Sequence, residues 1–438
     1  MNSTISDVLA FVKEHDVKFV RLGFCDPFGF QKNISIMAHE LPAAFAQGVS
    51  IDAHAIRGFR DAARSDLLLF PVAGTLTVLP WRPGPGRVMR FYCDIKNPDG
   101  TPFARDGRYL LRRVVQRAEA MGYVCKVGAE CEFYLFKTDE HGEPTYTTLD
   151  RGGYLDISPL DKGEDIRREI CLTLEEMGIQ PEASHHEQGP GQNEVDFKFS
   201  DAMGCADNLL TFKSVVKAIA ARNGLFASFM PKPIAGAPGS GMHVNLSLTK
   251  NGRNLFEQGS VQGTAAASFM AGILAKTPEI SLFLNPLVNS YERFGAFEAP
   301  RYVSWSPQNR SQLVRIPAAS GEKLRMELRS PDPTANPYLA FALILAAGLD
   351  GIEQNMQPPE PVEADLFAAD ESVTGRLTRL PESLAEAIEL AQKSDLVRQV
   401  LGAEFLDCHL AMQKAEAEAF AAAKDKQAFY RERYFPMI

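Results

Sequence analysis

Acidic residues gather around a short turn near the middle of the chain. The stretch EQGPGQNEVDF carries Glu187 and Glu194 on either side of a turn built from glycine and proline. The apolar run VGAECEFYLF carries Glu130 and Glu132, which share one face of a strand because side chains alternate along it. Clustered carboxylates raise one another's pKa unless cations neutralise them. The pattern therefore indicates a cation site.

Two more strand-like runs carry polar side chains on one face. His243 alternates with Asn245 in MHVNLSL, and Glu327 alternates with Arg329 in RMELR. Hard divalent ions prefer oxygen ligands, and magnesium keeps waters or phosphates in its remaining positions. Five glutamates and a histidine predict a site for two such ions. The candidate ligands are Glu130, Glu132, Glu187, Glu194, His243 and Glu327.

Each of these features taken alone has a simpler interpretation. A polar pair at i and i+2 is usually the solvated face of a half-buried strand. His243 alone would more often be a hydrogen-bonded core histidine. The adjacent histidines of SHHE do not form a zinc motif, because neighbours on a strand face opposite ways. Only the combination favours a metal site.

Arginines crowd the stretch 290–330, at positions 293, 310, 315, 325 and 329. Forked guanidinium groups that face carboxylate or phosphate are what a phosphoryl-transfer site needs beside its metals. A surface network of arginine and glutamate would show the same composition. The sequence contains neither GxxxxGK[ST] nor a strand-bound GxGxxG, so a nucleotide must be held in another way.

Composition excludes several classes of protein. The net charge of −9 argues against a nucleic-acid binder, which usually presents a basic face. The longest apolar run, residues 338–349, is too short to span a bilayer and is predicted to be a buried helix. Seven cysteines without paired spacing indicate a reduced compartment, and we expect a cytoplasmic protein with no membrane partner.

The elements that must position these residues follow an α+β pattern. We expect a helix over 6–15 capped by Ser6, then a hairpin around DPFG, a short helix closed by Gly48, and three more strands. The turn-rich segment 96–107 marks a boundary, which divides the chain into domains 1–103 and 104–438. The second domain is predicted to contain one long strand, VCKVGAECEFYLF, and a helix over 208–224 capped by Asp207. Its tail, 382–434, is predicted to be largely helical.

Several long segments, in order, resemble type I glutamine synthetase over nearly the whole chain. They are GAECEF, GGYLDISPLD, SHHEQGPGQNEVDF, KPIAGAPGSGMHVNLSL, NSYERF, the EAP of AFEAPRY, NRSQLVRIP and RMELRSPDPTANPY. The resemblance implies an N-terminal β-grasp domain and a C-terminal catalytic domain with a curved antiparallel sheet flanked by helices. It also implies a homo-oligomer, a dodecamer of two stacked hexameric rings, with active sites between neighbouring subunits. The substrates would be glutamate, ATP and ammonium, and the cofactors Mg²⁺ or Mn²⁺.

The resemblance also implies a role for each matching residue. One metal ion would be held by Glu132, Glu187 and Glu194, and the second, beside the ATP phosphates, by Glu130, His243 and Glu327. Glutamate would be bound by Arg293, Arg329, Gly239 and His243, and ATP by Ser247, Arg315, Arg325 and Glu182. The catalytic residues would be Asp52, which a neighbouring subunit supplies to deprotonate ammonium, Tyr154 of the ammonium pocket, the flap residue Glu298 and the phosphate-facing Arg310.

The chain departs from the family pattern on the side of the nitrogen donor. The family motif DGSS is DAHA here, from Asp52 to Ala55, and the asparagine of NGSGMH is Pro238. This combination of retained and altered motifs leaves three possible functions. The first is a ligase that makes glutamine from glutamate and ammonia through γ-glutamyl phosphate. The second is a γ-glutamyl-amide ligase that uses an organic amine, as several relatives do. The third is a non-catalytic structural or regulatory homologue.

Overall fold

The N-terminal part of the chain is a six-stranded sheet with two helices on one face. A computed structural model describes residues 4–81, 86–258 and 263–438. The sheet has the strand order β2-β1-β6-β4-β3, with β5 beside β6. Among the described strands of this sheet, β1 and β6 pair in parallel and the other pairs are antiparallel. The elements are α1 (Ile5–Glu14), β1 (Val17–Cys25), β2 (Gln31–Met37), α2 (Leu41–Gln47), β3 (Val49–Asp52), β4 (Asp66–Pro71), β5 (Thr77–Val78) and β6 (Arg87–Lys96).

The predicted hairpin and short helix of this part are confirmed. β1 pairs with β2 in antiparallel fashion, and Gly48 ends α2 with a φ of 74°. The predicted helix cap is wrong. Thr4, not Ser6, precedes α1, and it exchanges hydrogen bonds with Asp7 in a capping box. The predicted boundary between residues 103 and 104 remains a proposal.

The catalytic part contains two mainly antiparallel sheets. The five-stranded sheet has the order β10-β11-β8-β13 with β9 beside β8, and the seven-stranded sheet has the order β12-β7-β14-β18-β17-β16 with β15 beside β14. β16 and β17 pair in parallel. The strands are β7 (Val124–Cys131), β8 (Phe133–Thr138), β9 (Pro144–Thr148), β10 (Pro181–His186), β11 (Gln192–Phe197), β12 (Ser200–Asp201), β13 (Leu225–Ser228), β14 (Met242–Lys250), β15 (Arg253–Asn254), β16 (Trp305–Pro307), β17 (Val314–Ile316) and β18 (Met326–Leu328).

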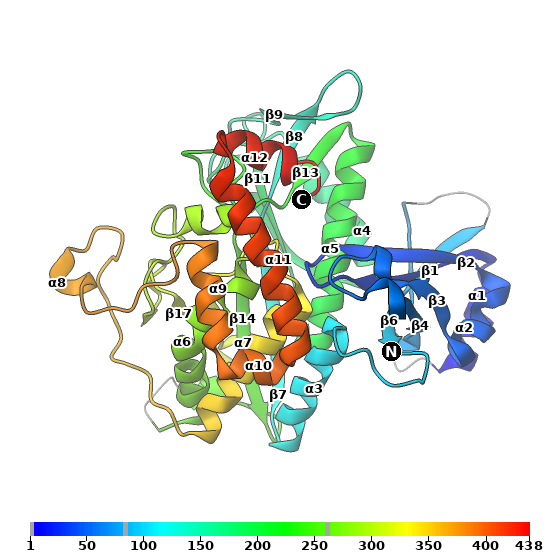
Figure 1. Ribbon diagram of the computed structural model, residues 1–438. Helices are drawn as coiled ribbons and strands as arrows, with labels where there is room; N and C mark the ends of the chain where they lie inside the picture. The colour runs from blue at the N-terminus through cyan, green and yellow to red at the C-terminus, as the bar shows by residue number, and fades with distance from the viewer. Residues whose placement is uncertain (1–3, 82–85, 259–262) are drawn as a thin grey trace.

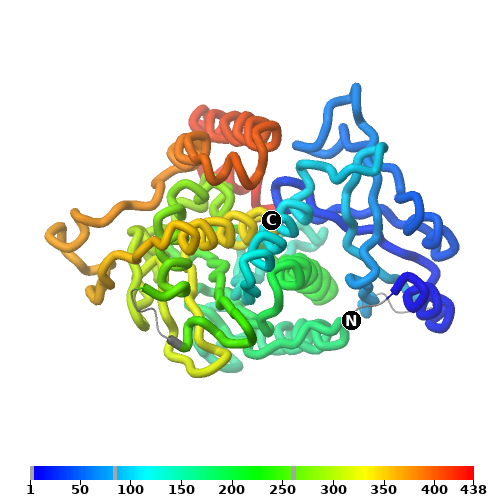
Figure 2. The backbone as a smooth tube through the Cα atoms, turned by 90° about the horizontal axis from the view of Figure 1, so that it is seen from below, coloured from blue at the N-terminus to red at the C-terminus, as the bar shows by residue number. Residues whose placement is uncertain are grey.

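Helices pack against these sheets, and Figures 1 and 2 show the N-terminal sheet lying beside the helices and strands of the catalytic part. The predicted helical tail is confirmed. The helices are α3 (Gly107–Ala120), α4 (Glu164–Glu176), α5 (Ala202–Arg222), α6 (Ala265–Leu284), α7 (Pro337–Glu353), α8 (Glu371–Thr374), α9 (Leu384–Lys393), α10 (Asp395–Leu401), α11 (Ala403–Ala422) and α12 (Lys426–Arg433).

The predicted long strand is two strands in different sheets. The break falls at Glu132, because β7 continues the seven-stranded sheet and β8 enters the five-stranded sheet. The N–H of Glu132 donates to the carbonyl of Gly241 at 3.1 Å and joins the break to the segment before β14. The helix predicted over 208–224 also begins earlier, because Asp201 caps α5. Asp207 lies within α5 and pairs with Arg108 at 3.0 Å.

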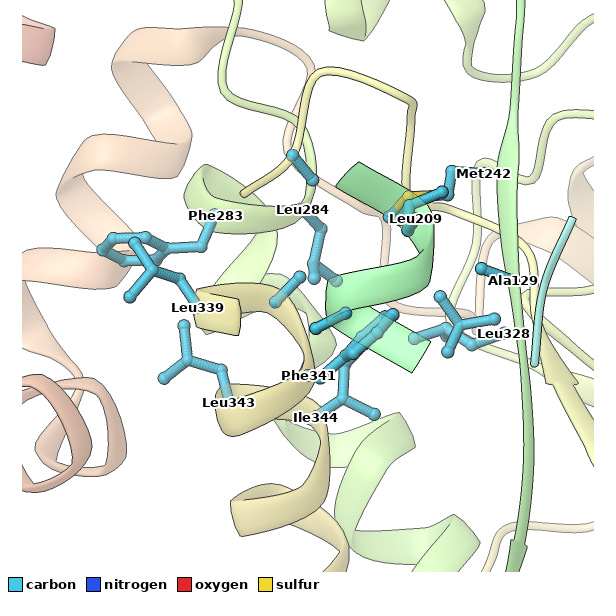
Figure 3. Close-up of a cluster of buried hydrophobic side chains, with 14 of the residues drawn as sticks. Ala129, Leu209, Met242, Phe283, Leu284, Leu328, Leu339, Phe341, Leu343 and Ile344 are labelled. Carbon is cyan, nitrogen blue, oxygen red and sulfur yellow. The ribbon is translucent and has the colours of Figure 1, made fainter. Parts of the chain in front are cut away.

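The core lies behind the strands that carry the polar residues. Figure 3 shows Ala129 of β7, Met242 of β14 and Leu328 of β18 near Leu209 of α5 and Phe341 of α7. Alternation then sends their sequence neighbours to the opposite face of the sheet. Because the apolar side chains of these strands are buried against the helices, the polar side chains of the same strands lie together on the opposite face of the sheet.

The apolar run at 338–349 lies within α7 and is buried, as predicted. α7 packs closely on α6, where a Cβ on Gly272 would lie 2.1 Å from the carbonyl oxygen of Ala347. Of the described residues, α6 is the one helix long and apolar enough to cross a membrane, and 78 % of its apolar window is buried inside the protein. α6 is therefore a core helix of this fold.

Candidate active site

A cavity of about 330 Å³ opens where the two catalytic sheets meet. β7, β11 and β14 reach it, together with loops from the second half of the domain. Most of the predicted site residues line this cavity. They are Glu130, Glu132, Tyr154, Glu187, Glu194, Gly239, His243, Arg293, Glu298, Arg310, Arg315 and Arg329.

Strand register gathers one group of three ligands. β14 places His243 opposite Glu130, and β18 places Glu327 opposite Asn245, two residues further along β14. His243 Nδ1 lies 3.5 Å from an oxygen of Glu130 and 3.5 Å from an oxygen of Glu327. One donor atom from each residue lies within 4.8 Å of the others. The group predicted for the second metal ion is therefore compact.

Charge neighbours keep this group ionised. Burial raises the pKa of Glu130, but hydrogen bonding and the charge of His243 outweigh it and lower the pKa to about 2. Burial likewise raises the pKa of Glu327, and the charges of Arg329 and His243 bring it below its usual value. The pair offers carboxylate oxygens, which a hard cation accepts as ligands.

In the other predicted group, Glu132, Glu187 and Glu194, burial outweighs the compensating contacts, although Glu132 accepts hydrogen bonds from the N–H of Gly241 and from Gln192 Nε2. Burial and the negative charge of Glu187 raise the pKa of Glu132 to about 8. Burial and the charge of Asp196 raise the pKa of Glu194 well above its usual range. Buried carboxylates in this state are what a divalent cation would neutralise. Among the described residues, the compact group at Glu194 is His185, Glu194 and Asp196, and Glu132 and Glu187 do not complete it with a donor atom each within 4.8 Å. The group Glu130, His243 and Glu327 fits Mg²⁺ or Mn²⁺, whose preferred donors are oxygens with an occasional imidazole.

A second cavity, of about 520 Å³, adjoins the first on the outer side of the seven-stranded sheet. Glu182, Ser247 and Arg325 line it, as the resemblance implies for residues that bind ATP. Glu130 and Asp196 line both cavities. The acidic cluster therefore stands at the junction between the two spaces, where a phosphoryl group would pass from one to the other.

The arginines at the first cavity have two kinds of hydrogen-bond partner, a carboxylate and a backbone carbonyl. Arg315 and Arg329 both pair with the carboxylate of Glu327, Arg329 through Nη1 at 2.6 Å. Arg293 is 3 % exposed, and its Nη1 donates to the carbonyl of Ser330 at 3.0 Å. The Nε atoms of Arg293 and Arg329 are buried and have no hydrogen-bond partner among the described residues. Arg293 and Arg329 nevertheless line the cavity, and guanidinium groups in such a position suit an incoming carboxylate.

Glu298 lies across the mouth of the cavity on a strained turn. Phe297 and Glu298 have φ values of 50° and 66°, in the left-handed region that L-residues rarely adopt. The Glu298 carboxylate accepts a hydrogen bond from Gln188 Nε2 at 3.2 Å and lies 3.6 Å from Arg310 Nη1. Arg329 Nη2 donates to the Glu298 carbonyl at 3.2 Å. The segment 295–299 is called the flap below.

Asp52 does not line either cavity of its own chain. It is exposed at the end of β3, where its side chain accepts a hydrogen bond from the N–H of His54 at 2.9 Å. Within a single chain, Asp52 is therefore not brought together with the other predicted site residues.

Sequence reasoning missed His185, Gln188, Gln192 and Asp196, which also line the cavity. Asp196 could have been found by alternation, because it is two residues beyond Glu194 on β11. His185 faces Glu194 across the β10–β11 ladder. The expectation that the two histidines of SHHE point apart is confirmed, because His186 is fully buried behind the cavity.

His186 joins the turn that carries Glu187 to Asp150. Its Nδ1 lies 2.6 Å from the carbonyl oxygen of Glu187, and its Nε2 lies 2.9 Å from Asp150 Oδ1. The same oxygen accepts the N–H of Gly191 at 2.9 Å. Asp150 thus holds both ends of the turn that carries Glu187.

We expect Asp150→Asn to weaken Mn²⁺ binding about 10–100-fold, the usual effect of removing a partner that orients metal ligands. An Mn²⁺ titration followed by electron paramagnetic resonance measures the affinity. Asp139→Asn is the control, because Asp139 binds backbone N–H groups in an exposed hairpin away from the cavity. Unchanged affinity in a folded Asp150→Asn protein would contradict this role.

Comparison with known proteins agrees with this geometry. The model of the glutamine synthetase β-grasp domain matches residues 16–98, and the model of the glutamine synthetase catalytic domain matches residues 104–432. The chain belongs to the glutamine synthetase family, and its fold class is the predicted α+β combination of these two domains.

Individual relatives cover nearly the whole chain. The chain is 47 % identical over 419 residues to the glutamine synthetase of Clostridium saccharobutylicum, which covers 94 % of this chain and 95 % of that protein. It is 46 % identical over 426 residues to that of Methanosarcina mazei, covering 96 % and 95 %. Two solved structures of GmaS, one an ADP complex and one without ligand, each superpose with a TM-score of 0.88 at 31 % identity, over 98 % of this chain and 99 % of theirs. The chain is therefore an enzyme of a family that uses ATP and divalent metals to join nitrogen to glutamate.

Proposed function

We propose that the protein makes glutamine from glutamate and ammonia at the expense of ATP, through γ-glutamyl phosphate. The observation that carries this proposal is the acidic cluster at the junction of two cavities. One cavity is lined by Arg293 and Arg329, which suit a carboxylate substrate, and the other is lined by Ser247 and Arg325, which suit a nucleotide. The curated relatives that are 43–47 % identical carry the name glutamine synthetase.

The first step activates a poor acyl donor. An oxygen of the substrate's γ-carboxylate attacks the γ-phosphorus of ATP, and ADP leaves. Arg293 and Arg329 would hold glutamate, and Arg310 and Arg315 would face the transferring phosphoryl group, where fixed positive charge stabilises the transition state. Glu130, His243 and Glu327 would hold one metal ion and Glu132, Glu187 and Glu194 another. When bound, these ions would neutralise phosphate charge.

The second step replaces phosphate by nitrogen. Ammonia attacks the carbonyl carbon of γ-glutamyl phosphate, the C–O bond to phosphate breaks, and Glu298 takes up the proton that the nitrogen loses. The flap excludes water, which would otherwise hydrolyse the acyl phosphate. Tyr154 and Glu187 stand at the edge where ammonium would enter.

Asp52 would reach this edge only from a neighbouring subunit. We propose a homo-oligomer, with two stacked hexameric rings as its form, in which the Asp52 loop of one chain completes the site of the next. Seven free cysteines suit a reduced cytoplasmic location.

An organic amine in place of ammonia is the second candidate. The loop DAHA favours it, because the small serines of the family motif are replaced by Ala53, His54 and Ala55, which changes the shape of the donor pocket. The retained acids Asp52 and Glu187 favour a small cation.

Phosphate release from ATP in the presence of Mg²⁺ and glutamate separates these candidates. We expect low concentrations of ammonium to saturate the enzyme and to give glutamine, with small primary amines at least about tenfold poorer in kcat/KM, which is a difference of about 1.4 kcal/mol in transition-state binding. Activity with one amine only would replace the ammonia proposal by the amide-ligase proposal. No phosphate release with any nitrogen donor would mean a non-catalytic homologue.

A further inference from the structure

A buried lysine that is not among the predicted site residues, Lys232, contacts both the loop that carries Gly239 and the flap. Lys232 is 8 % exposed and precedes the loop that carries Gly239. Its Nζ donates to the carbonyl of Ala237 at 2.6 Å, and its own carbonyl accepts from Asn289 Nδ2 at 3.2 Å. The ammonium group is thus fixed by the loop on which the glutamate substrate would rest.

The same ammonium group lies over the flap. Its Nζ is 4.8 Å from the ring centre of Phe297, a cation–π distance. Phe297 lines the catalytic cavity, yet its side chain is 47 % exposed, so much of the ring faces away from protein. Burial and the charge of Arg293 lower the pKa of Lys232, as expected for a cation removed from water. Desolvation also strengthens a cation–π contact.

The flap needs such contacts because its backbone is strained. Phe297 and Glu298 are consecutive residues with positive φ, a conformation that persists only when surrounding contacts hold it. Glu298 is held by Gln188 and Arg329. Phe297 is held on the opposite side by Lys232.

We propose that Lys232 is a positioning residue that couples the glutamate-binding loop to the flap. Bound glutamate would order the loop around Ala237. The ammonium group of Lys232 would then lie against Phe297 and favour the closed flap over γ-glutamyl phosphate. The inference rests on the proposed function for its chemistry. Its structural part, the stability of the closed flap, stands independently of the nitrogen donor.

Lys232→Met tests the coupling, because it keeps the aliphatic stem and removes the charge. The amides of Gly295 and Ala299 donate to the carbonyls of Ala299 and Ala296 within the flap, so their hydrogen exchange reports loosening of the strained flap turn that Lys232 holds. We expect these amides to exchange about 2–30-fold faster in the variant, the range that a cation–π contact supports. Lys137→Met, on the exposed side of β8, is the matched control and should exchange like the wild type.

The chemical readout is the ratio of phosphate released to amide formed. The wild type should give a ratio near one, and Lys232→Met should raise the excess of phosphate over amide about 2–30-fold, because water reaches the acyl phosphate when the flap opens more often. Phe297→Leu should raise the ratio in the same way, and Phe297→Tyr, which keeps a ring, should restore it. A purely structural lysine would lower both products together and leave the ratio unchanged.

Two results would overturn the inference. One is unchanged exchange of the flap amides in Lys232→Met, and the other is a ratio that stays at the wild-type value in both Lys232→Met and Phe297→Leu. Failure of the proposed function would give a different result, because the wild-type protein itself would then form no amide.

Discussion

Glu327→Gln should lower kcat for glutamine formation at least about 10³-fold while the protein stays folded. Glu327 is 1 % exposed, and its carboxylate faces His243, Arg315 and Arg329 at the same time. The amide keeps the volume but has one oxygen in place of two and no charge. It therefore removes a proposed metal ligand and the negative charge that pairs with Arg315 and Arg329.

The choice of glutamine over alanine follows from the buried arginine. Both substitutions remove the charge of this partner, but glutamine keeps a side-chain oxygen that can accept from Arg329 Nη1, which is 2.6 Å from Glu327 Oε1. Alanine would leave Arg329, itself 1 % exposed, without any acceptor there, and breaking a buried ion pair outright costs about 3–5 kcal/mol of folding free energy. Steady-state kinetics together with circular dichroism during heating would separate lost chemistry from lost folding. Glu389→Gln, an exposed position on α9, serves as the control. A variant that keeps more than a tenth of the wild-type kcat would contradict the assignment of Glu327 to a metal ion.

Removing the metal should make stability fall as pH rises from about 5 to 8. The pKa of Glu132 is about 8 in the folded protein, above its ordinary value of 4.5, so the folded state binds more protons than the unfolded state over this interval. The free energy of unfolding of the metal-free protein should therefore drop, by on the order of 4 kcal/mol at about 1.4 kcal/mol for each pKa unit. Above pH 8 the loss from this group is complete.

Mg²⁺ should reverse the trend, because it binds the deprotonated carboxylates. Its stabilising effect should be larger at pH 8 than at pH 6. Urea denaturation with and without Mg²⁺ across this pH range measures both effects, and Glu132→Gln should flatten the pH dependence of the metal-free protein. Glu143→Gln, at an exposed position, is the control. A metal-free protein whose stability does not change between pH 5 and 8 would show that burial does not raise the pKa of Glu132.

The sequence by itself determined which side chains share a face. Alternation along a strand depends only on local backbone geometry, so Glu130 with Glu132 and His243 with Asn245 could be paired before any fold was known. Both glutamates line one cavity even though the strand breaks at Glu132. The long family motifs added the fold class and most of the cavity lining, because they preserve residue identity at each position.

The tertiary structure decided how distant segments meet. The passage of the chain from one sheet to the other at Glu132 depends on which strands pair, and that choice depends on the packing of α5 and α7 behind the sheets. Local sequence also placed two helix caps wrongly, because Ser6 and Asp207 are good capping residues whose positions are taken by Thr4 and Asp201. The first residue of a helix depends on how the preceding segment packs in the fold, and a local sequence pattern carries no information about that packing.

The contacts that stabilise and orient the site belong wholly to the tertiary structure. Asp150 and His186 are 36 residues apart, and their contact exists because the segment after β9 folds against the end of β10. Lys232 contacts Phe297 only because the loop that carries Gly239 and the flap lie beside the same cavity. Alternation and motifs are properties of single segments, whereas these contacts are properties of pairs of segments. That is why the sequence predicted the acids of the site, and only the fold placed the residues that hold them.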